Sequence, residues 1–348
     1  MRIFSLLLLA GVWSTPLAAG TVTLTFEGFP DSTILTSQYS GMAFGDAIIL
    51  TAGITLNEFE FPPHSGSNVA SDNNGPMTIS FTSPTQSFSG YFTYAELLTM
   101  RAFNSANNQV AVATSRFSSN EAVSGNTSST PNELLQVTSA NGISRVNITG
   151  APAGSSFTLD DATITPITPV TVPALSTPLL MLLGLALAAL ALRTKALDGL
   201  GSRKRLALIV VLAPLVLWLS ASPQQFRSRQ QASRAAPRIA RFSADRTAVL
   251  TNTPTLVTLS ARIDHPALIA GSVNLIRVDA SGLPVVVGQF HDDGKNGDGV
   301  AGDHTYTIQV TLNERSAGQV RFQVSGAFHG LVKRLLSNPV TLTIKAAQ

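Results

Sequence analysis

The sequence predicts an all-β protein in which an N-terminal and a C-terminal β-sandwich are joined by a two-helix transmembrane hairpin. Short runs rich in Thr, Ser, Val and Ile, separated by Gly, Asn and Pro turns, fill both ends of the chain and favour strands. Two uncharged apolar runs stand near its middle, within residues 172–221. A chain of 348 residues allows about two or three domains of ordinary size.

Charge is divided unevenly between the two ends of the chain. Residues 20–167 carry 3 basic and 11 acidic side chains, a net charge of −8, whereas residues 223–348 carry 14 basic and 8 acidic ones, a net charge of +6. An acidic domain lacks the cations that neutralise phosphates, so a nucleic-acid partner is not expected. The chain has no cysteine, which excludes disulfides, thiol catalysis and zinc sites with cysteine ligands.

Residues 1–19 are typical of a secretory signal peptide. Arg2 precedes the apolar stretch SLLLLAGVW, and small residues follow up to Ala19. Cleavage there leaves a mature chain that begins outside the cytoplasm. The alternative, an uncleaved membrane anchor, is disfavoured because the apolar stretch is short.

Residues 20–166 form the predicted N-terminal sandwich. Short apolar or β-branched runs alternate there with turn clusters such as SDNNGP and NSANN. This spacing favours a β-sandwich, and no helical periodicity competes with it. The predicted strands are TVTLTF, AIILTAGITL, NEFEF, MTISF, SFSGYFTY, QVAVATS, ELLQV, SRVNIT and SFTLDDATI.

The two ends of this domain carry a family resemblance. TFEG at Thr25–Gly28 and FTLDDATI at Phe157–Ile164 resemble the first and last strands of jelly-roll domains in exported bacterial proteins, a fold shared with many carbohydrate-binding modules. The resemblance implies a structural calcium ion held by Glu27 and Asp161, with Asp160 as a neighbour, and carboxylates are suitable calcium ligands. The alternative is that the two aspartates begin a turn and the glutamate is solvated.

Aromatic residues of the same domain are candidates for stacking on a sugar ring. Because alternate residues of a strand face opposite sides of the sheet, Tyr91 and Tyr94 should not both face the core. For each phenylalanine, burial in the core is the expected role. The candidates are Phe59, Phe61, Phe88, Tyr91, Phe92 and Tyr94.

Residues 167–178 form a Pro/Thr-rich spacer that cannot be helical. The sequence VPALS at Val172–Ser176, with the apolar run and basic tail that follow, resembles the IPTL-CTERM and PEP-CTERM sorting signals. Such signals are read by exosortase-type membrane enzymes of Gram-negative bacteria. The resemblance therefore implies processing at this site and display at the cell surface, and a plain membrane hairpin is the alternative.

The hairpin is predicted from residues 179–192 and 206–221, the cores of two transmembrane helices. A helix crosses a bilayer with about 20 apolar residues, and neither run contains a charged residue. Residues 193–205 between them carry five basic side chains and one acid, which the positive-inside rule places in the cytoplasm. Both sandwiches are then periplasmic domains of an inner-membrane protein. The second run ends in Leu219-Ser220-Ala221, where signal-peptidase cleavage would release the C-terminal half.

Residues 222–241 form a predicted flexible linker with five arginines and no acid, suited to anionic lipid headgroups. Residues 242–348 return to a strand pattern, and roughly six or seven strands over about 100 residues are typical of an immunoglobulin-like sandwich. The predicted strands are TLVTLSARI, SVNLIRVDA, LPVVVGQF, TYTIQVTL, GQVRFQVSGAF and PVTLTIK.

An Asp/Gly-rich stretch, HDDGKNGDGVAGDHTYT, separates two of these strands and resembles a loop of choice-of-anchor and related immunoglobulin-like domains of bacterial surface proteins. Counted against a 12-residue EF-hand loop, it places Asp292, Asn296, Asp298 and Asp303 at positions 1, 5, 7 and 12, which predicts a second calcium site. The alternative is a hairpin loop whose Asp and Gly residues serve turn geometry. Its GxGxxG match, residues 297–302, is not a dinucleotide site, because no helix is expected after it.

No catalytic constellation is predicted. The five histidines show no paired ligand spacing, and no GxSxG elbow occurs. We therefore expect a membrane-anchored, outward-facing, non-catalytic binding protein of the bacterial envelope, with calcium as a structural ion and polysaccharide as the ligand. The alternatives are a structural or adhesive surface protein and, third, a hydrolase.

Overall fold

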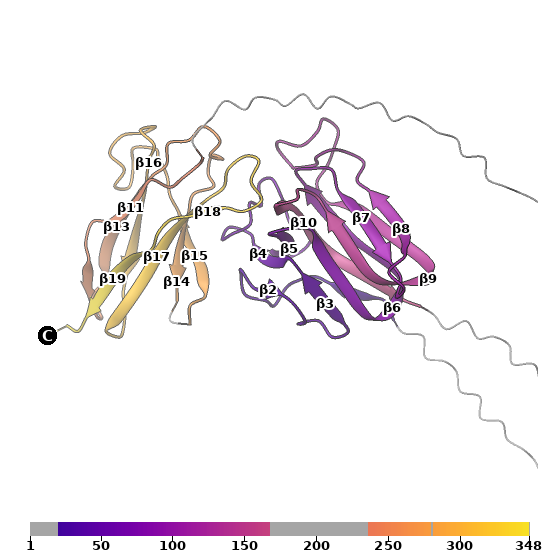
Figure 1. The fold of residues 1–348 in the computed structure, drawn as a ribbon. Coiled ribbons are helices and arrows are strands. Elements are labelled where there is room, and N and C mark those ends of the chain that lie inside the picture. Colours follow the sequence, from indigo (N-terminus) through magenta and orange to yellow (C-terminus); the bar gives the residue numbers. More distant parts are fainter. Residues whose placement is uncertain (1–19, 168–235, 280, 348) are drawn as a thin grey trace, which may run out of the picture. The chain divides into compact units, whose positions relative to one another are not determined.

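A computed structural model describes residues 20–167, 236–279 and 281–347. The described residues form strands and turns with no helix, which confirms the predicted all-β class (Figure 1). The described residues 20–167 and 236–347 belong to one compact unit, and each of these two parts forms its own hydrophobic core.

The N-terminal part is a single ten-stranded antiparallel sheet with the order β2-β4-β5-β10-β6-β9-β7-β8, in which β1 pairs with β10 and β3 with β6. The strands are β1 (Val22–Leu24), β2 (Ile34–Leu35), β3 (Met42–Gly45), β4 (Ala47–Thr51), β5 (Asn68–Asn73), β6 (Met77–Tyr94), β7 (Thr99–Phe103), β8 (Gln109–Thr114), β9 (Glu133–Thr149) and β10 (Gly154–Pro166).

The long strands β6, β9 and β10 fold this sheet into two layers. The first part of β6 pairs with β3 and its second part with β10, and the register of β6 against β9 shifts between Ser80 and Thr85. Such irregularities bend a strand and increase its twist. The layers are therefore continuous through the bent strands, whereas the predicted jelly-roll consists of two separate sheets. Fully buried aromatic side chains lie between them: Phe26, Phe88, Phe92, Tyr94 and Phe157.

The C-terminal part is a sandwich of two sheets, with the orders β11-β13-β16 and β12-β19-β17-β14-β15, and β18 pairs with β17. With β11, β13 and β16 taken as strands A, B and E, and β14, β17 and β19 as C, F and G, this arrangement resembles an immunoglobulin-like sandwich whose first sheet has no strand D among the described residues. The strands are β11 (Arg241–Ala244), β12 (Ala248–Leu250), β13 (Thr255–Arg262), β14 (Asn274–Val278), β15 (Pro284–Gln289), β16 (Thr305–Leu312), β17 (Gly318–Gly326), β18 (Leu335–Leu336) and β19 (Val340–Lys345).

The predicted transmembrane hairpin is not part of this fold, and that part of the predicted fold class is corrected. The described residues include no helix long and apolar enough to cross a membrane. The two apolar runs, 179–192 and 206–221, lie outside the described residues, as do the sorting-like motif and the Leu219-Ser220-Ala221 site. In the described chain the two sandwiches are joined by direct contact between their loops, because Val332 of the second packs in one apolar cluster with residues of the first.

Strand boundaries differ from the prediction in several places, and ELLQV and SRVNIT, for example, are parts of the one strand β9. MTISF and SFSGYFTY are parts of the one strand β6, since the chain continues through Pro84 at the register shift. NEFEF is a turn, in which the amide of Phe61 donates to the carbonyl of Asn57 at 2.8 Å. The C-terminal sandwich begins before residue 242, because Ile239 already packs against its core.

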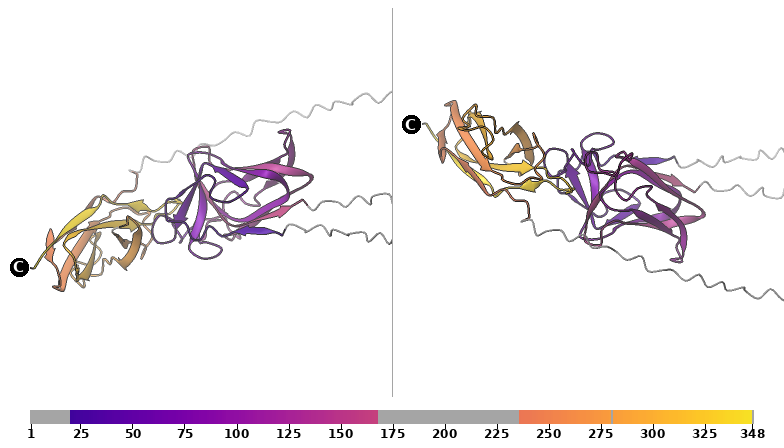
Figure 2. Two further views of the ribbon diagram at one scale, coloured as in Figure 1. Left: turned by 90° about the horizontal axis from the view of Figure 1, so that it is seen from below. Right: turned by 90° about the horizontal axis from the view of Figure 1, so that it is seen from above.

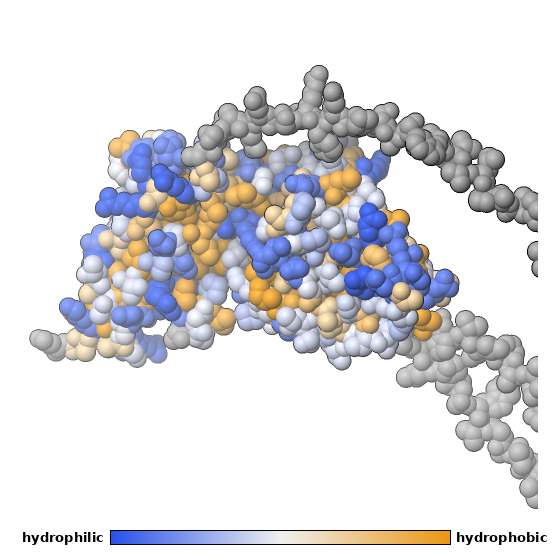
Figure 3. Space-filling model, viewed as in Figure 1, coloured by the Kyte–Doolittle hydropathy of each residue, from blue (hydrophilic) through white to orange (hydrophobic). Residues whose placement is uncertain are grey.

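The strand β15 is an edge of its sheet and is unusually apolar on its surface. Val285, Val286 and Val287 are exposed by 49%, 41% and 42%. On the face shown in Figure 3, hydrophobic residues gather over the C-terminal sandwich where β14 and β15 lie. Two further views of the strands are given in Figure 2.

Candidate metal centre

The Asp/Gly-rich loop, residues 292–304, connects β15 to β16 and is closed at its base. His291 and Thr307 form an isolated antiparallel bridge, with amide-to-carbonyl distances of 3.0 and 2.7 Å. Phe290, which directly precedes this bridge, is buried in the core of the C-terminal sandwich. The loop therefore starts from a fixed stem, which limits where its carboxylates can lie.

Positive φ angles turn the loop back on itself. Gly294, Gly297 and Gly302 have φ values of 71°, 93° and 76°, in the left-handed region that glycine adopts without a steric penalty. Asn296 also has a positive φ, 49°, which asparagine tolerates better than most residues. The glycines that resembled a dinucleotide fingerprint are thus turn residues.

Three of the four predicted loop ligands come together. Asp292, Asp298 and Asp303 each offer a carboxylate oxygen, and these oxygens all lie within 4.8 Å of one another. Among the described residues, this is the group of three or more His, Cys, Asp or Glu side chains that is compact enough to share a metal ion. Asn296, the fourth predicted ligand, is exposed.

The loop backbone orients the carboxylate of Asp292. Its Oδ1 accepts hydrogen bonds from the amides of Gly302 and Asp303 at 2.7 and 3.2 Å, and its Oδ2 accepts one from His304 at 3.0 Å. Asp303 in turn accepts from the amide of Thr305 at 2.8 Å. These bonds fix the direction of both side chains before any ion binds.

Asp298 has a carboxylate oxygen that differs from the others of the cluster in its burial and hydrogen bonding. The residue is only 8% exposed, and its Oδ2 accepts a hydrogen bond from the amide of Gly294 at 2.6 Å. Its Oδ1 is buried and has no hydrogen-bond partner. An unsatisfied buried carboxylate oxygen costs free energy, and a cation shared by this oxygen and the two neighbouring carboxylates would remove that cost.

The donor set suits calcium. Three carboxylates repel one another, and a divalent ion between them replaces that repulsion with attraction. Calcium accepts six to eight oxygen ligands in flexible geometry, so main-chain carbonyls of the loop and water can complete the shell, whereas thiolate and imidazole metals find no suitable ligands in this group.

A polar groove of about 300 Å³ opens beside the cluster, over the outer face of the sheet β11-β13-β16. Asp298 and Asp303 form part of its wall. A second hollow of about 380 Å³ continues along the same face past Arg241 and Arg262. The two hollows are lined by the hydroxyl residues Ser243, Thr258, Ser260, Thr305 and Thr307.

Strand register explains why this face is polar. Ser243 lies opposite Ser260, which lies opposite Thr307, and the core residues Leu259 and Ala261 alternate with them. Alternation along the strands sends the hydroxyls outward and the apolar side chains inward. Sequence reasoning missed this surface, although the alternation in TLVTLSAR is visible in the sequence and could have shown it.

The other predicted calcium ligands, Glu27, Asp160 and Asp161, all contact one loop, residues 64–68. Glu27 Oε1 accepts from the amides of Ser67 and Asn68 at 2.8 and 2.7 Å. The three side chains thus border the same loop, but they are not a group of carboxylates close enough to share one ion among the described residues. Their carboxylates are occupied by protein donors, and calcium at this place stays a prediction.

The two aspartates of this place differ in environment. Asp160 is 1% exposed, and its Oδ2 accepts from the amides of His64 and Ser65 at 2.8 and 2.9 Å. Burial raises the pKa of Asp160 to about 6, although these hydrogen bonds act against the rise. Asp161 binds side chains instead, with His64 Nδ1 2.6 Å from its Oδ2.

The aromatic candidates for sugar stacking are mostly core residues. Tyr94 is fully buried, whereas Tyr91 is half-buried and stacks on His64 with ring centroids 3.5 Å apart, so the prediction that the two tyrosines face opposite sides is confirmed. Phe59 is 36% exposed. The other candidates, Phe61, Phe88 and Phe92, are fully buried.

Comparisons with known proteins leave the family open. No protein-family model and no curated protein matches the sequence. Among solved structures, a beta-1,2-glucanase from Parabacteroides distasonis is 8% identical with a TM-score of 0.20, and the alignment covers 92% of this chain and 39% of that one. A DUF4785 family protein from Legionella pneumophila is 8% identical with a TM-score of 0.21, covering 93% of this chain and 71% of that one.

Proposed function

We propose that the protein is a non-catalytic binding protein that holds calcium in the loop 292–304 and engages polysaccharide in the adjoining polar groove. The supporting observation is the buried, unpartnered Oδ1 of Asp298 next to the carboxylates of Asp292 and Asp303. Asp298 and Asp303 of the same cluster form part of the groove wall, which lets an ion and a ligand share a site.

The lining of the groove favours sugar hydroxyls over other ligands. Hydroxyl side chains donate and accept hydrogen bonds, and carboxylates and the guanidinium groups of Arg241 and Arg262 bind the same groups more strongly. The lining residues of both hollows include no histidine and no aromatic ring among the described residues. Recognition therefore rests on hydrogen bonds and the ion, and not on ring stacking.

Calcium binding is tested by thermal unfolding of the full chain with calcium, with magnesium and with chelator. A ligand at 100 times its Kd stabilises the folded state by about 2.7 kcal/mol. We expect calcium to raise the Tm of the wild type and of Asp293→Asn, whose carboxylate accepts only from Lys295 in the same loop. Asp298→Asn should lose this shift. An equal Tm of the wild type with calcium and with chelator would rule out the site.

Polysaccharide binding is tested separately, with a glycan panel probed by the full chain in calcium and in chelator. Selective binding that disappears with chelator and in Asp298→Asn supports the proposal. If folded protein binds calcium but no glycan, the proposed polysaccharide binding is wrong. A structural or adhesive role is then favoured.

A further inference from the structure

The loop after β17, residues 327–334, pairs with the N-terminal sandwich as a strand would. Leu56 and Lys333 form an isolated antiparallel bridge. On either side of it, the amide of Asn57 donates to the carbonyl of Val332 at 2.9 Å, and the amide of Arg334 donates to the carbonyl of Thr55 at 2.8 Å. The two sandwiches thus share backbone hydrogen bonds, which are sensitive to register and specific to these two segments.

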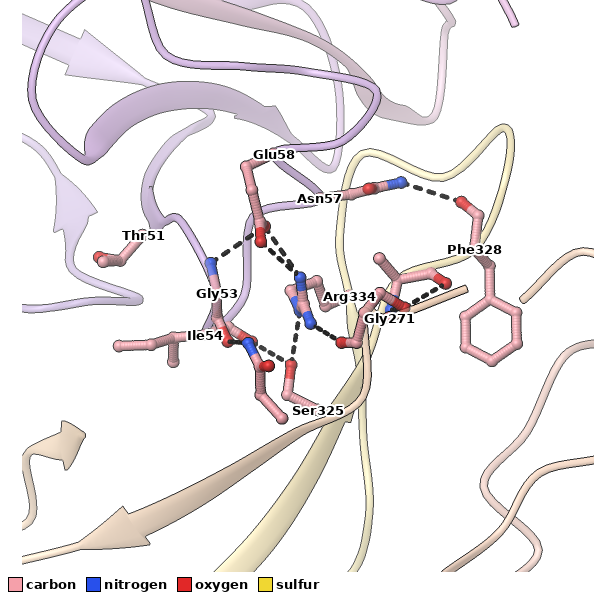
Figure 4. Close-up of polar contacts among 12 residues, drawn as sticks. Thr51, Gly53, Ile54, Asn57, Glu58, Gly271, Ser325, Phe328 and Arg334 are labelled. Carbon is pink, nitrogen blue, oxygen red and sulfur yellow. Dashed lines mark hydrogen bonds and ion pairs between the residues drawn. The ribbon is translucent and has the colours of Figure 1, made fainter. Parts of the chain in front are cut away.

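Arg334 is the centre of this contact (Figure 4). Its side chain is 0% exposed, and Nη1 lies 2.9 Å from both carboxylate oxygens of Glu58 in the N-terminal sandwich. Nε donates to Ser325 Oγ at 2.8 Å, and that hydroxyl donates to the carbonyl of Ile54 at 2.7 Å. Nη2 donates to the carbonyl of Ser272. A fully buried guanidinium without Glu58 would be a costly unpaired charge.

Asn57 of the N-terminal sandwich forms hydrogen bonds to the backbone of the C-terminal sandwich. Its side-chain amide is fully buried and donates to the carbonyls of Phe328 and Leu331 at 2.9 and 2.8 Å. Asn274 of the C-terminal sandwich donates to the carbonyl of Gly53 at 3.0 Å, so each sandwich inserts an amide into the backbone of the other.

Apolar burial and charge complete the contact. Val332 is 2% exposed and packs with Leu50, Leu56, Phe61 and Val69, while it belongs to neither large core. At the margins, Nδ1 of His329 lies 2.6 Å from Oε1 of Glu60, and Nζ of Lys333 donates to Asn73 at 2.9 Å. The acidic N-terminal part and the basic C-terminal part therefore meet with complementary groups.

We propose that the two sandwiches are a self-sufficient docking pair, which stays assembled as a non-covalent complex after the chain between residues 168 and 235 is cut. The surface of each sandwich then has a defined partner of matching chemistry: the loop 327–334 on one side and the turn 51–61 on the other. This inference is independent of the calcium site, which lies at a different loop of the C-terminal sandwich.

The test uses the full chain with a protease recognition sequence inserted between Arg193 and Arg205 and an affinity tag at the C-terminus. After complete cleavage at micromolar concentration, the C-terminal fragment is captured and the recovered N-terminal fragment is quantified. We expect the two to be recovered in equal amounts at low and at high salt, because buried pairs are little screened. Separation of the wild-type fragments would overturn the proposal.

Val332→Asp shows whether the described contact is what holds the fragments. It places a carboxylate in the apolar cluster without touching either large core, and recovery of the N-terminal fragment should fall at least about tenfold. The matched control is Val112→Asp, since Val112 is 53% exposed and lies outside all three clusters. Retention of the fragments by Val332→Asp would show that residues 169–235 hold them, and would refute the proposal.

Asn57→Asp tests the same contact from the other sandwich. This change keeps the size of the side chain but turns a carboxylate oxygen toward two carbonyl oxygens, so it should release the fragments as well. Circular dichroism of the separated fragments should show that both remain folded. Release by neither variant counts against the proposal even if the wild type stays assembled.

Discussion

Glu121 illustrates how much a single buried carboxyl group depends on its neighbours. The residue is 7% exposed, its Oε1 has no hydrogen-bond partner, and burial together with the nearby charge of Glu60 raises its pKa to about 7. Burial would also raise the pKa of Glu60, but hydrogen bonds from His329, Ser124 and Val123 outweigh it and hold that pKa low. Two neighbouring carboxyl groups thus have pKa values that are shifted in opposite directions.

The raised pKa of Glu121 predicts a pH-dependent stability. In the unfolded chain the group ionises near its ordinary pKa of 4.5, whereas in the folded protein its pKa of about 7 keeps it protonated to higher pH. The unfolded state therefore releases its proton first, and stability falls as pH rises from about 4.5 to 7, by about 1.4 kcal/mol for each unit of pKa difference. Urea unfolding at pH 5, 6, 7 and 8 should show this fall in the wild type.

Glu121→Gln is the matched variant for that measurement, because it keeps the shape of the neutral acid and cannot ionise. The free energy of unfolding of this variant should change less than that of the wild type between pH 5 and 7. At pH 8 the variant should be more stable than the wild type. A wild type and a variant with parallel pH profiles would show that Glu121 is not the titrating group.

At the level of elements, tight turns position the long strands. Gly154, which opens β10, has a φ of 78°, and a Cβ there would lie 2.7 Å from the backbone nitrogens of Asn74 and Gly75. Gly282, in the turn between β14 and β15, has a similar φ of 87° but open space around it. The two glycines share a backbone conformation and differ in packing.

Replacing each of these glycines by alanine separates the two effects. Gly282→Ala should cost about 1 kcal/mol, the penalty for a left-handed backbone with a side chain. Gly154→Ala should cost clearly more, because backbone atoms of the neighbouring turn must also move. The free energies of unfolding from urea titrations give the comparison, and equal losses would show that the turn before β10 adapts to a side chain.

Periodicity in the sequence predicted most strands but not their partners. TYTIQVTL is one strand from Thr305 to Leu312, as predicted, because its alternation of apolar and polar residues is complete. Asn68–Asn73 was missed, since NVASDN is polar and its strand character comes from pairing with β4 and β10. The carboxylate cluster of the loop was predictable from spacing, whereas the pairing of Glu58 with Arg334, 276 residues apart, leaves no local pattern.

For the whole molecule, the buried ion pair couples the stability of the two sandwiches. Wild-type protein should therefore unfold as one calorimetric transition. Arg334→Met removes the bond to Glu58 and should split this transition into two, because Glu58, whose side chain is 26% exposed, loses its partner at the contact.

The control for that calorimetry is Arg246→Met. Arg246 pairs with Asp245 within the C-terminal sandwich, and both side chains are well exposed, so its loss should leave a single transition. Two transitions in the wild type would mean that the sandwiches unfold independently despite their contact.

The distance along the chain between Glu58 and Arg334 also sets an order of events during synthesis. At about 5 to 20 residues per second, translation of the intervening 276 residues takes roughly 15 to 55 seconds. During this time Leu56 and Phe61 lack the cover of Val332, and the side chain of Asn57 lacks its two acceptors. Until residues 328–334 have been synthesised, the N-terminal sandwich therefore exposes an apolar surface that can bind other chains. Its folding is complete only when the loop 327–334 covers this surface.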